Sequence, residues 1–209
     1  MELEKYPSII VNNDVVRSLP FPLDKEEGPW ISGGSARRMM FRWSIDSDID
    51  VFFKSWKQLE KWQKALREIE DKRRPPNFLR VDDEPKKGTN QITFYVPSAS
   101  DPTREYKVQL ICKDVYPSME KLVDTFDFNV CQVVFDGSNF YYPKNSLPAI
   151  SAGLIKVHRV TYPVSTFRRV QKYLSKGNFT IEGPEIVKLI QQLYDSLGSE
   201  DEEGLYREE

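Results

Sequence analysis

The 209-residue sequence has few of the residues that build disulfide-linked or zinc-linked folds. Its two cysteines, Cys112 and Cys131, do not form a Cys-x-x-Cys pair, and His158 is its single histidine. These residues are too few for a zinc finger or for the disulfide framework that small secreted proteins use in place of a large core. The cysteine and histidine content therefore favours a reduced, intracellular protein.

Long apolar runs are also missing. No stretch of about 18 apolar residues occurs, so the sequence contains no predicted membrane span. The first residues, Met-Glu-Leu-Glu-Lys-Tyr-Pro, are acidic and lack the apolar centre of a secretory signal. We therefore expect a cytoplasmic protein, inside the host cell if the protein is viral, with no membrane partner.

Neither sign of charge dominates the sequence. Thirty Lys and Arg residues against 32 Asp and Glu residues give a formal net charge of −2. This overall charge does not attract nucleic acid, so any contact with nucleic acid has to come from a local basic patch. With 39% hydrophobic residues, the length suits one good core or a head domain with a small helical appendage.

A turn of small residues follows the apolar pair Trp30-Ile31 and precedes residues 36–41, which lack Gly and Pro. This order predicts a short strand, a tight turn and the start of a helix. Unpaired N–H groups and the positive dipole end at a helix start attract phosphate, and glycines let the backbone approach it closely. The candidate nucleotide-binding residues of this turn are Gly33, Gly34 and Ser35, the last of which adds a hydroxyl donor.

Closely spaced acids follow the turn. Residues 45–53 alternate in a pattern typical of a strand, with Asp48 and Asp50 on one face. Two carboxylates this close repel one another unless a cation lies between them, and oxygen ligands beside a phosphate-binding turn suit Mg²⁺ or Mn²⁺. The alternative is a solvated acidic strand edge. The turn and the acids together, one short helix apart, favour a site.

The stretch from the turn to the acids resembles the nucleotidyltransferases of the DNA polymerase β superfamily. Gly34-Ser35 and Asp48-Ile49-Asp50 carry this resemblance, and the form Gly-Gly-x-x-Arg with Asp-Ile-Asp looks most like the branch of CCA-adding enzymes and poly(A) polymerases. The resemblance covers residues 28–143. It implies an α/β (α+β) fold, a mixed-sheet head flanked by helices. It also implies that Asp48 and Asp50 hold Mg²⁺ or Mn²⁺ at a nucleoside triphosphate such as ATP, and that Arg37 or Arg38 balances the phosphate charge.

The third acid of such a site is not evident. Two-metal nucleotidyl transfer usually uses three carboxylates, and the resemblance puts the third on the strand where this sequence has Gln109. Glu105, at the start of that strand, and Asp127 are the available substitutes. We expect Asp127 to complete the catalytic and metal-binding set. The alternative is that Asp127 is a structural carboxylate that bonds backbone N–H groups or an arginine such as Arg37.

Residues around Asp127 carry a second, partial resemblance. Phe126-Asp127-Phe128-Asn129 is similar to the Arg-Asp-Phe-Thr-x-Asn motif of the CCA-adding branch, with the leading Arg and the Thr replaced. The longer string from 108 to 137 resembles a divergent group of nucleotidyltransferase-like proteins of viruses and large multidomain proteins.

Periodicity predicts the remaining elements of the head. A helix is expected within 8–19, an amphipathic helix at 56–69, a polar loop at 72–90, a hairpin of strands 91–96 and 105–112, a short helix at 118–123, and a second hairpin of 126–135 with 140–142. We expect the tryptophans of the amphipathic helix to lie in the core rather than to stack on bases.

The C-terminal third predicts two helices. One follows Tyr162 and ends at Gly177, the next opens at Gly183-Pro184, and an acidic tail follows. The expected domains are a head at 1–160, a neck-like extension at 161–198 and a disordered tail at 199–209. The first helix aligns a basic ridge that suits a nucleic-acid backbone or a triphosphate, with a solvated helix face as the alternative. The ridge consists of Arg168, Arg169, Lys172 and Lys176.

These features predict a metal-dependent transfer of a nucleoside monophosphate from an NTP to a hydroxyl acceptor, with pyrophosphate leaving. The expected acceptor is an RNA 3′ end, as in tRNA-processing relatives. A protein or small-molecule hydroxyl stays open because the chain has little room for domains that measure tRNA. The alternative function is a catalytically weak or inactive nucleotidyltransferase-like module that binds nucleotides or proteins, which Gln109 and the divergent motif at Asp127 favour.

Overall fold

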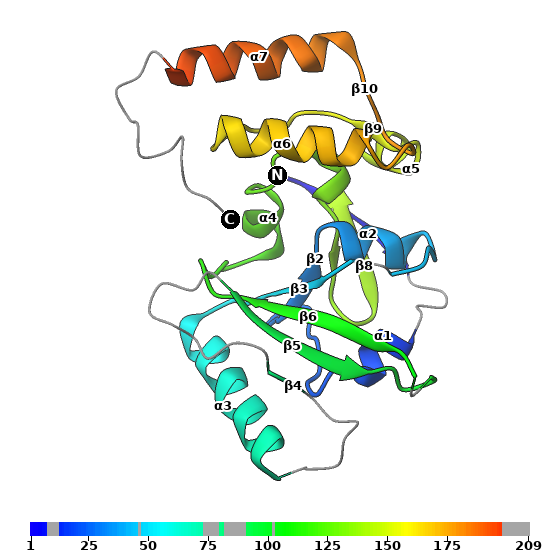
Figure 1. The fold of residues 1–209 in the computed structure, drawn as a ribbon, viewed down its shortest axis with the longest axis vertical. Coiled ribbons are helices and arrows are strands. Elements are labelled where there is room, and N and C mark those ends of the chain that lie inside the picture. Colours follow the sequence, from blue (N-terminus) through cyan, green and yellow to red (C-terminus); the bar gives the residue numbers. More distant parts are fainter. Residues whose placement is uncertain (8–12, 46, 73–79, 82–90, 102, 198–209) are drawn as a thin grey trace.

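The computed structural model describes residues 1–7, 13–45, 47–72, 80–81, 91–101 and 103–197 (Figure 1). The predicted acidic tail, most of the predicted polar loop and the first part of the predicted N-terminal helix lie outside these residues.

The described residues form an eight-stranded mixed sheet with the order β1-β8-β7-β2-β3-β6-β5-β4. The parallel pair β3–β6 lies near its centre, and the other neighbouring strands are antiparallel. The strands are β1 Leu3–Pro7, β2 Trp30–Ser32, β3 Ile49–Phe52, β4 Arg80–Val81, β5 Gln91–Pro97, β6 Glu105–Ile111, β7 Val134–Phe135 and β8 Asn139–Pro143. Two further strands, β9 Leu154–Ile155 and β10 Thr180–Ile181, form a small parallel sheet. The expected mixed α/β architecture is confirmed.

Helices lie around this sheet, with α3 at one end of the molecule and α6 and α7 at the other (Figure 1). They are α1 Asn13–Ser18, α2 Gly34–Met40, α3 Trp56–Lys72, α4 Met119–Val123, α5 Leu147–Ser151, α6 Pro163–Leu174 and α7 Gly183–Leu197, and a 3₁₀ helix, η1, spans Asn129–Cys131. Within the described ranges, no helix is both long enough and apolar enough to cross a membrane.

Helix α3 forms where the apolar spacing predicted it. Leu59, Trp62 and Leu66 recur at three- and four-residue steps and are buried in the main core. The Trp62 ring lies 3.9 Å from the ring of Phe21, centroid to centroid. The core role of this stripe is confirmed, although Trp56, in the first turn, is half exposed.

The segment 126–133 is not the predicted strand; only Val134–Phe135 joins the sheet as β7. Side-chain hydrogen bonds to the backbone replace a strand ladder here. The Asn129 amide donates to the carbonyl of Leu154 and accepts from the N–H of Lys156, and the Gln132 amide donates to the carbonyl of Val123. The apolar residues of the segment are therefore free to pack away from the sheet.

Those apolar residues form a core of their own with the C-terminal helices. Phe128 and Val130 are buried against Val170 of α6 and Leu189 of α7. This core also includes Phe179 and the region of β9. The predicted domain boundary at residue 160 stays a prediction, but buried contacts cross it.

The N-terminal region differs from its prediction in part. Residues 3–7 form β1, an edge strand paired with β8, and α1 covers only 13–18 of the predicted helix. The short elements α5, β9 and β10 were also not predicted. Each is five residues or fewer, so none repeats the apolar spacing often enough to be recognised.

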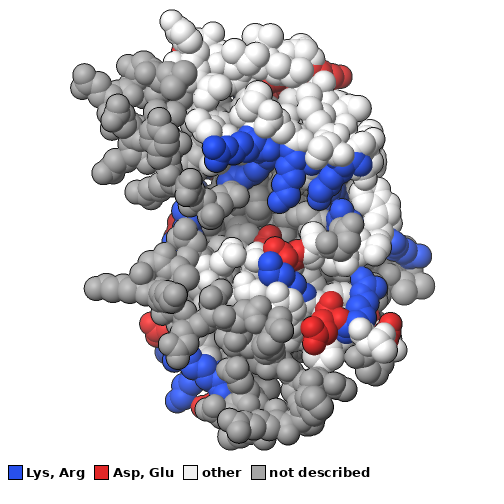
Figure 2. All heavy atoms as spheres, in the orientation of Figure 1, with Lys and Arg blue, Asp and Glu red and all other residues white. Residues whose placement is uncertain are grey.

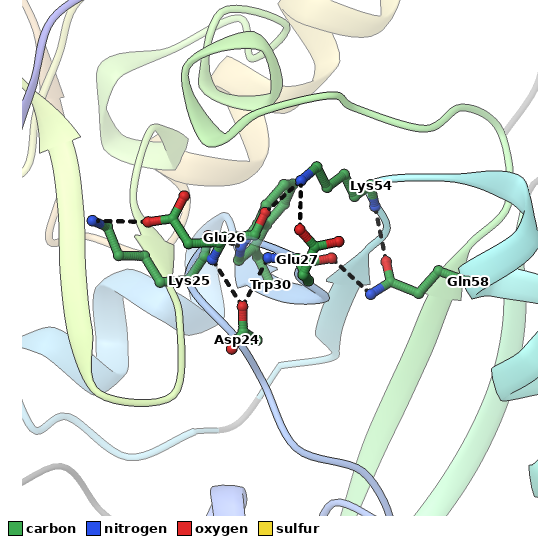
Figure 3. A network of polar contacts seen from close by, with 7 residues as sticks. All are labelled: Asp24, Lys25, Glu26, Glu27, Trp30, Lys54 and Gln58. Atoms are coloured by element: carbon green, nitrogen blue, oxygen red, sulfur yellow. Dashed lines mark hydrogen bonds and ion pairs between the residues drawn. The ribbon is translucent and has the colours of Figure 1, made fainter.

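A network of polar contacts fixes the loop before β2 (Figure 3). The Asp24 carboxylate accepts hydrogen bonds from the N–H groups of Glu26 and Glu27, at 2.8 and 2.7 Å. Lys54, just after β3, donates to the carbonyl of Glu26, and Gln58 of α3 donates to that of Glu27. The entry to β2, and hence the turn that follows it, is thereby tied to the end of β3.

A second network holds α1 on the hairpin β5–β6. The buried Asp14 carboxylate accepts hydrogen bonds from Ser98 Oγ, Tyr106 OH and the N–H of Ser100, each at 2.6 Å. Burial alone raises its pKa, but the hydrogen bonds from Ser98 and Tyr106 outweigh burial, so the pKa of Asp14 is lowered. The stabilisation is therefore present above the ordinary carboxylate pKa and is lost as the pH falls through the folded value.

We expect Asp14→Ala to lower the free energy of unfolding by about 2–4 kcal/mol, because it leaves buried donors without an acceptor. Asp24→Ala, which removes an exposed turn carboxylate, should cost about 1 kcal/mol. Urea titrations at pH 7 compare the two variants. Equal losses of unfolding free energy in the two variants would contradict the larger contribution that we expect from the buried Asp14 network.

Candidate active site

The turn at the start of α2 lies directly beside the acidic strand. Gly33 has φ of 83°, a conformation that glycine adopts without strain. A Cβ atom built on Gly33 would lie 3.9 Å from Asp50 Oδ2 and 3.8 Å from Phe126 Cε1. At Gly34, the first residue of α2, the same construction meets open space. The predicted strand, turn and helix are confirmed. They place the backbone of Gly33 and Gly34, which carry no side chains, beside Asp50.

The side chain of Ser35 does not face this open space. It is buried, and its hydroxyl donates to the carbonyl of Ser32 at 3.4 Å. This position differs from the predicted contact of the hydroxyl with phosphate. The reason is that the first turn of α2 packs against β2, which directs Ser35 into the fold.

Arg37 is also buried, and it serves the packing of the C-terminal helices. Its Nη1 donates to the carbonyl of Val130 at 3.0 Å, and its guanidinium lies 4.5 Å from the ring centroid of Phe179. This geometry does not match the predicted contact with nucleotide phosphate. Arg38, the alternative, lies nearer the surface and donates to the carbonyl of Ser44 at 2.8 Å.

Asp48 and Asp50 lie together, as predicted. The parallel pairing of β3 with β6 sets Ile49 beside Val108 and Asp50 beside Gln109. Asp48 precedes this pairing and forms an ion pair with Lys107, with 3.2 Å between Oδ1 and Nζ.

The Asp50 carboxyl is electrostatically unfavourable as a free anion. Burial, and then the like charge of Asp48, raise its pKa to about 7, against the lowering effects of Lys107 and Lys172. The nearby lysines therefore do not fully compensate the acidic pair. A pair with an excess of negative charge beside an open stretch of backbone suits a cation carried by a phosphate ligand.

Gln109 occupies the position at which the resemblance places a third carboxylate. It is buried, and its backbone is level with Asp50 on one side and with Thr93 of β5 on the other. The predicted strand is confirmed, and its residue beside Asp50 is neutral.

Asp127 is used as an anchor for α6. Its Oδ2 accepts hydrogen bonds from Thr166 Oγ1, at 2.9 Å, and from Arg169, while its carbonyl accepts from the N–H of His158. This matches the alternative of a structural carboxylate bound to an arginine, although the arginine is Arg169 and not Arg37.

Among the residues that the structure describes, no third acid joins the pair. In the part of the chain that is described, no three His, Cys, Asp or Glu side chains are grouped closely enough to hold a metal ion. Asp127 therefore does not form the predicted group with Asp48 and Asp50. Glu105 lies at the exposed start of β6, four residues before Gln109 and so about 13 Å away along the strand.

The basic ridge of α6 comes close to the acidic pair. Lys172 is near enough to lower the pKa of Asp50, while Arg168 of the same helix and Lys176, two residues after its end, are exposed. Arg169 is engaged by Asp127. Figure 2 shows Lys and Arg side chains gathered along the helix, with acidic side chains on the same face of the molecule below them.

Lys107 is the site residue that sequence reasoning missed. The signal was present, because Lys107 and Gln109 share a strand face and have the same two-residue spacing as Asp48 and Asp50. Only the parallel register of β3 and β6 shows that the two pairs are neighbours.

Residues 3–153 match the family described as Gabija anti-defense 2 family protein. The chain belongs to this family. It is 27% identical over 163 residues to "Gabija anti-defense 2" of Bacillus phage SPbetaL7, an alignment that covers 77% of this chain and 36% of the relative. The chain thus spans little more than a third of the length of that relative. A phage relative agrees with the predicted resemblance to a divergent viral group.

The fold is similar to that of solved tRNA nucleotidyltransferases. One is a tRNA nucleotidyltransferase complexed with a primer tRNA and an incoming ATP analog, with a TM-score of 0.52, 16% identity, and 80% of this chain and 47% of that one covered. Another is a CCA-adding enzyme with ATP, with a TM-score of 0.52, 16% identity, and 80% and 38% covered. At these identities the likeness shows the fold alone, and it confirms the predicted nucleotidyltransferase fold.

We expect the raised pKa of Asp50 to appear in the pH dependence of stability. The folded protein holds this proton more tightly than the unfolded chain, so stability falls as the pH rises from about 4 to about 7. Asp50→Asn removes that loss. The free energy of unfolding of the variant should exceed that of the parent by about 2–4 kcal/mol at pH 8, and this difference should vanish near pH 4.

Chemical denaturation across pH 4 to 8 measures this difference. Asp48→Asn is the matched control, since it removes the like charge and leaves Asp50 half-buried, so its gain in unfolding free energy should be smaller. Parallel stability curves for Asp50→Asn and the parent would contradict the raised pKa.

Proposed function

We propose that the chain is the nucleotidyltransferase head of an anti-defense protein and transfers a nucleoside monophosphate from an NTP to a hydroxyl acceptor. The acceptor oxygen forms a bond to the α-phosphorus, the bond from that phosphorus to pyrophosphate breaks, and the hydroxyl proton passes to water. The observation that carries the proposal is the undercompensated pair Asp48–Asp50 beside Gly33 and the start of α2. The transfer serves to counter the Gabija defence that the family is named for.

The acidic pair fits a divalent cation. Mg²⁺ is commonly held by one or two carboxylates together with substrate phosphates, and Asp48 and Asp50 supply two carboxylates. When bound, Mg²⁺ or Mn²⁺ polarises the α-phosphate and offsets the charge of the triphosphate. Such a cation neutralises the charge of Asp50, whose pKa is raised first by burial and then by the like charge of Asp48.

The chain's own groups position the nucleotide. Gly33 and Gly34 let the backbone approach the phosphates, because neither carries a side chain and a Cβ atom built on Gly34 meets nothing within 4 Å. Lys172, which acts electrostatically on Asp50 from α6, offers a cation to the triphosphate. Ser35 and Arg37 stabilise the turn and its contact with the C-terminal helices instead.

The acceptor that we propose is an RNA 3′ end. The support is the basic ridge, which runs along α6 next to the acidic pair and suits a polynucleotide backbone. A structural neighbour was solved with a primer tRNA, which describes that protein. A protein or small-molecule hydroxyl is the alternative acceptor.

A second candidate function is nucleotide binding without transfer. Gln109 favours it, since a neutral amide stands where two-metal transfer uses a carboxylate. The two functions differ in whether the bond to pyrophosphate breaks.

We expect incubation with each α-labelled NTP, Mg²⁺ or Mn²⁺, and total RNA to yield labelled RNA. Asp50→Asn and Asp48→Asn should each slow transfer at least about 10²-fold, because each weakens binding of the cation that stabilises charge at the phosphate. Asp114→Asn, an exposed acid on another loop, is the control and should leave transfer unchanged. Parallel reactions with protein extract and metabolites test the other acceptors.

Unaltered transfer in Asp50→Asn would overturn the site. Saturable NTP binding with no transfer to any acceptor would favour the second candidate function. Far-ultraviolet circular dichroism and thermal melts confirm that each variant is folded.

The ridge is tested by its salt dependence. Replacing Arg168, Lys172 and Lys176 by Gln should flatten the slope of log affinity for single-stranded RNA against log salt by about 2, since each phosphate contact contributes about 0.7. The matched control replaces the exposed lysines of α3, Lys57, Lys61 and Lys64, and should keep the parent slope. An unchanged slope in the ridge variant would point to a protein or small-molecule acceptor.

A further inference from the structure

Lys107 lies where it acts on both acids of the site. Its Nζ is 3.2 Å from Asp48 Oδ1, and its charge also lowers the pKa of Asp50. An exposed ion pair on an ordinary surface contributes little to stability. The Lys107–Asp48 pair, by contrast, includes one of the two acids that we propose hold the cation. Its effect on cation binding therefore outweighs its effect on stability.

The strand register explains why Lys107 is there. Because β3 and β6 are parallel and Asp50 is level with Gln109, the residue two positions earlier on β6 comes beside Asp48. Lys107 and Gln109 therefore border the acidic pair from the strand that, in a two-metal site, supplies the third carboxylate. The chain has a cation and a neutral amide on that strand.

The charge balance then limits how many cations the site holds. Two metal ions bring four positive charges, which three carboxylates and the substrate phosphates share. Here the Lys107 ammonium lies 3.2 Å from the Asp48 carboxylate and also lowers the pKa of Asp50. An ammonium and a divalent cation a few ångströms apart repel by more than 1 kcal/mol even at high effective dielectric, roughly a tenfold loss of affinity or more.

We propose that this site binds one divalent cation, the one carried by the nucleotide, and that the Lys107 ammonium takes the place of a second. This inference rests on the proposed function. Lys107 supplies a fixed positive charge and hydrogen-bond donors beside Asp48. It is thus a substrate-positioning cation built into the strand.

Counting bound Mn²⁺ tests the proposal without any transfer reaction. Electron paramagnetic resonance titration of free Mn²⁺, with a non-hydrolysable α,β-methylene ATP and no acceptor, should give one Mn²⁺ per protein–nucleotide complex. The double variant Lys107→Met with Gln109→Glu, which removes the ammonium and adds a third carboxylate, should bind two. Lys107→Arg keeps the charge and should bind one, and Lys57→Met on α3 is the control for lysine loss.

Two Mn²⁺ ions on the parent complex, or one on a folded double variant, would overturn the proposal. If the double variant does not fold, Lys107→Met alone decides, because it should raise the affinity for a second Mn²⁺ at least about tenfold. If the analogue does not bind, the proposed function fails; if it binds together with two Mn²⁺ ions, the proposed function stands and the role of Lys107 fails.

Discussion

The parallel pairing of β3 with β6 is the contact on which the rest of the site depends. A parallel pair needs a long crossover, and here the segment between the two strands contains α3, β4 and β5. The pairing sets Asp50 level with Gln109 and brings Lys107 to Asp48. A shift of one residue would send Gln109 to the opposite face of the sheet, because side chains alternate along a strand. The charge of the site is therefore a property of the register.

The C-terminal helices are held to this sheet by polar groups as well as by a core. Arg37 reaches from α2 to the carbonyl of Val130 and to the ring of Phe179. Asp127 reaches Thr166 and Arg169 of α6. These buried contacts orient α6, and with it Lys172, toward the acidic pair. Residues predicted to bind nucleotide or metal thus position the helix that carries the basic ridge.

Several features were predictable because they rest on short-range patterns. The turn at Gly33-Gly34, the helix after it and the shared strand face of Asp48 and Asp50 follow from residues close in the chain. The hairpin β5–β6 and the helices α3, α6 and α7 show a regular period over at least five residues. The strand predicted at 126–135 was wrong over 126–133 because Asn129 and Gln132 bind distant backbone groups, and no local pattern reveals those partners.

The helix and hairpin periods and the acidic pair beside a glycine turn could be predicted from the amino-acid sequence alone, and the fold class followed from the family resemblance that this turn and pair carry. The periods, the turn and the pair depend on neighbours within a few residues, where backbone geometry links spacing to structure. Only the tertiary structure decided that Ser35 and Arg37 point inward, that Asp127 binds Arg169, and that Lys107 stands at Asp48. The reason is that burial, charge compensation and register are set by residues far apart in the chain, which meet only when β6 and α6 come to β3.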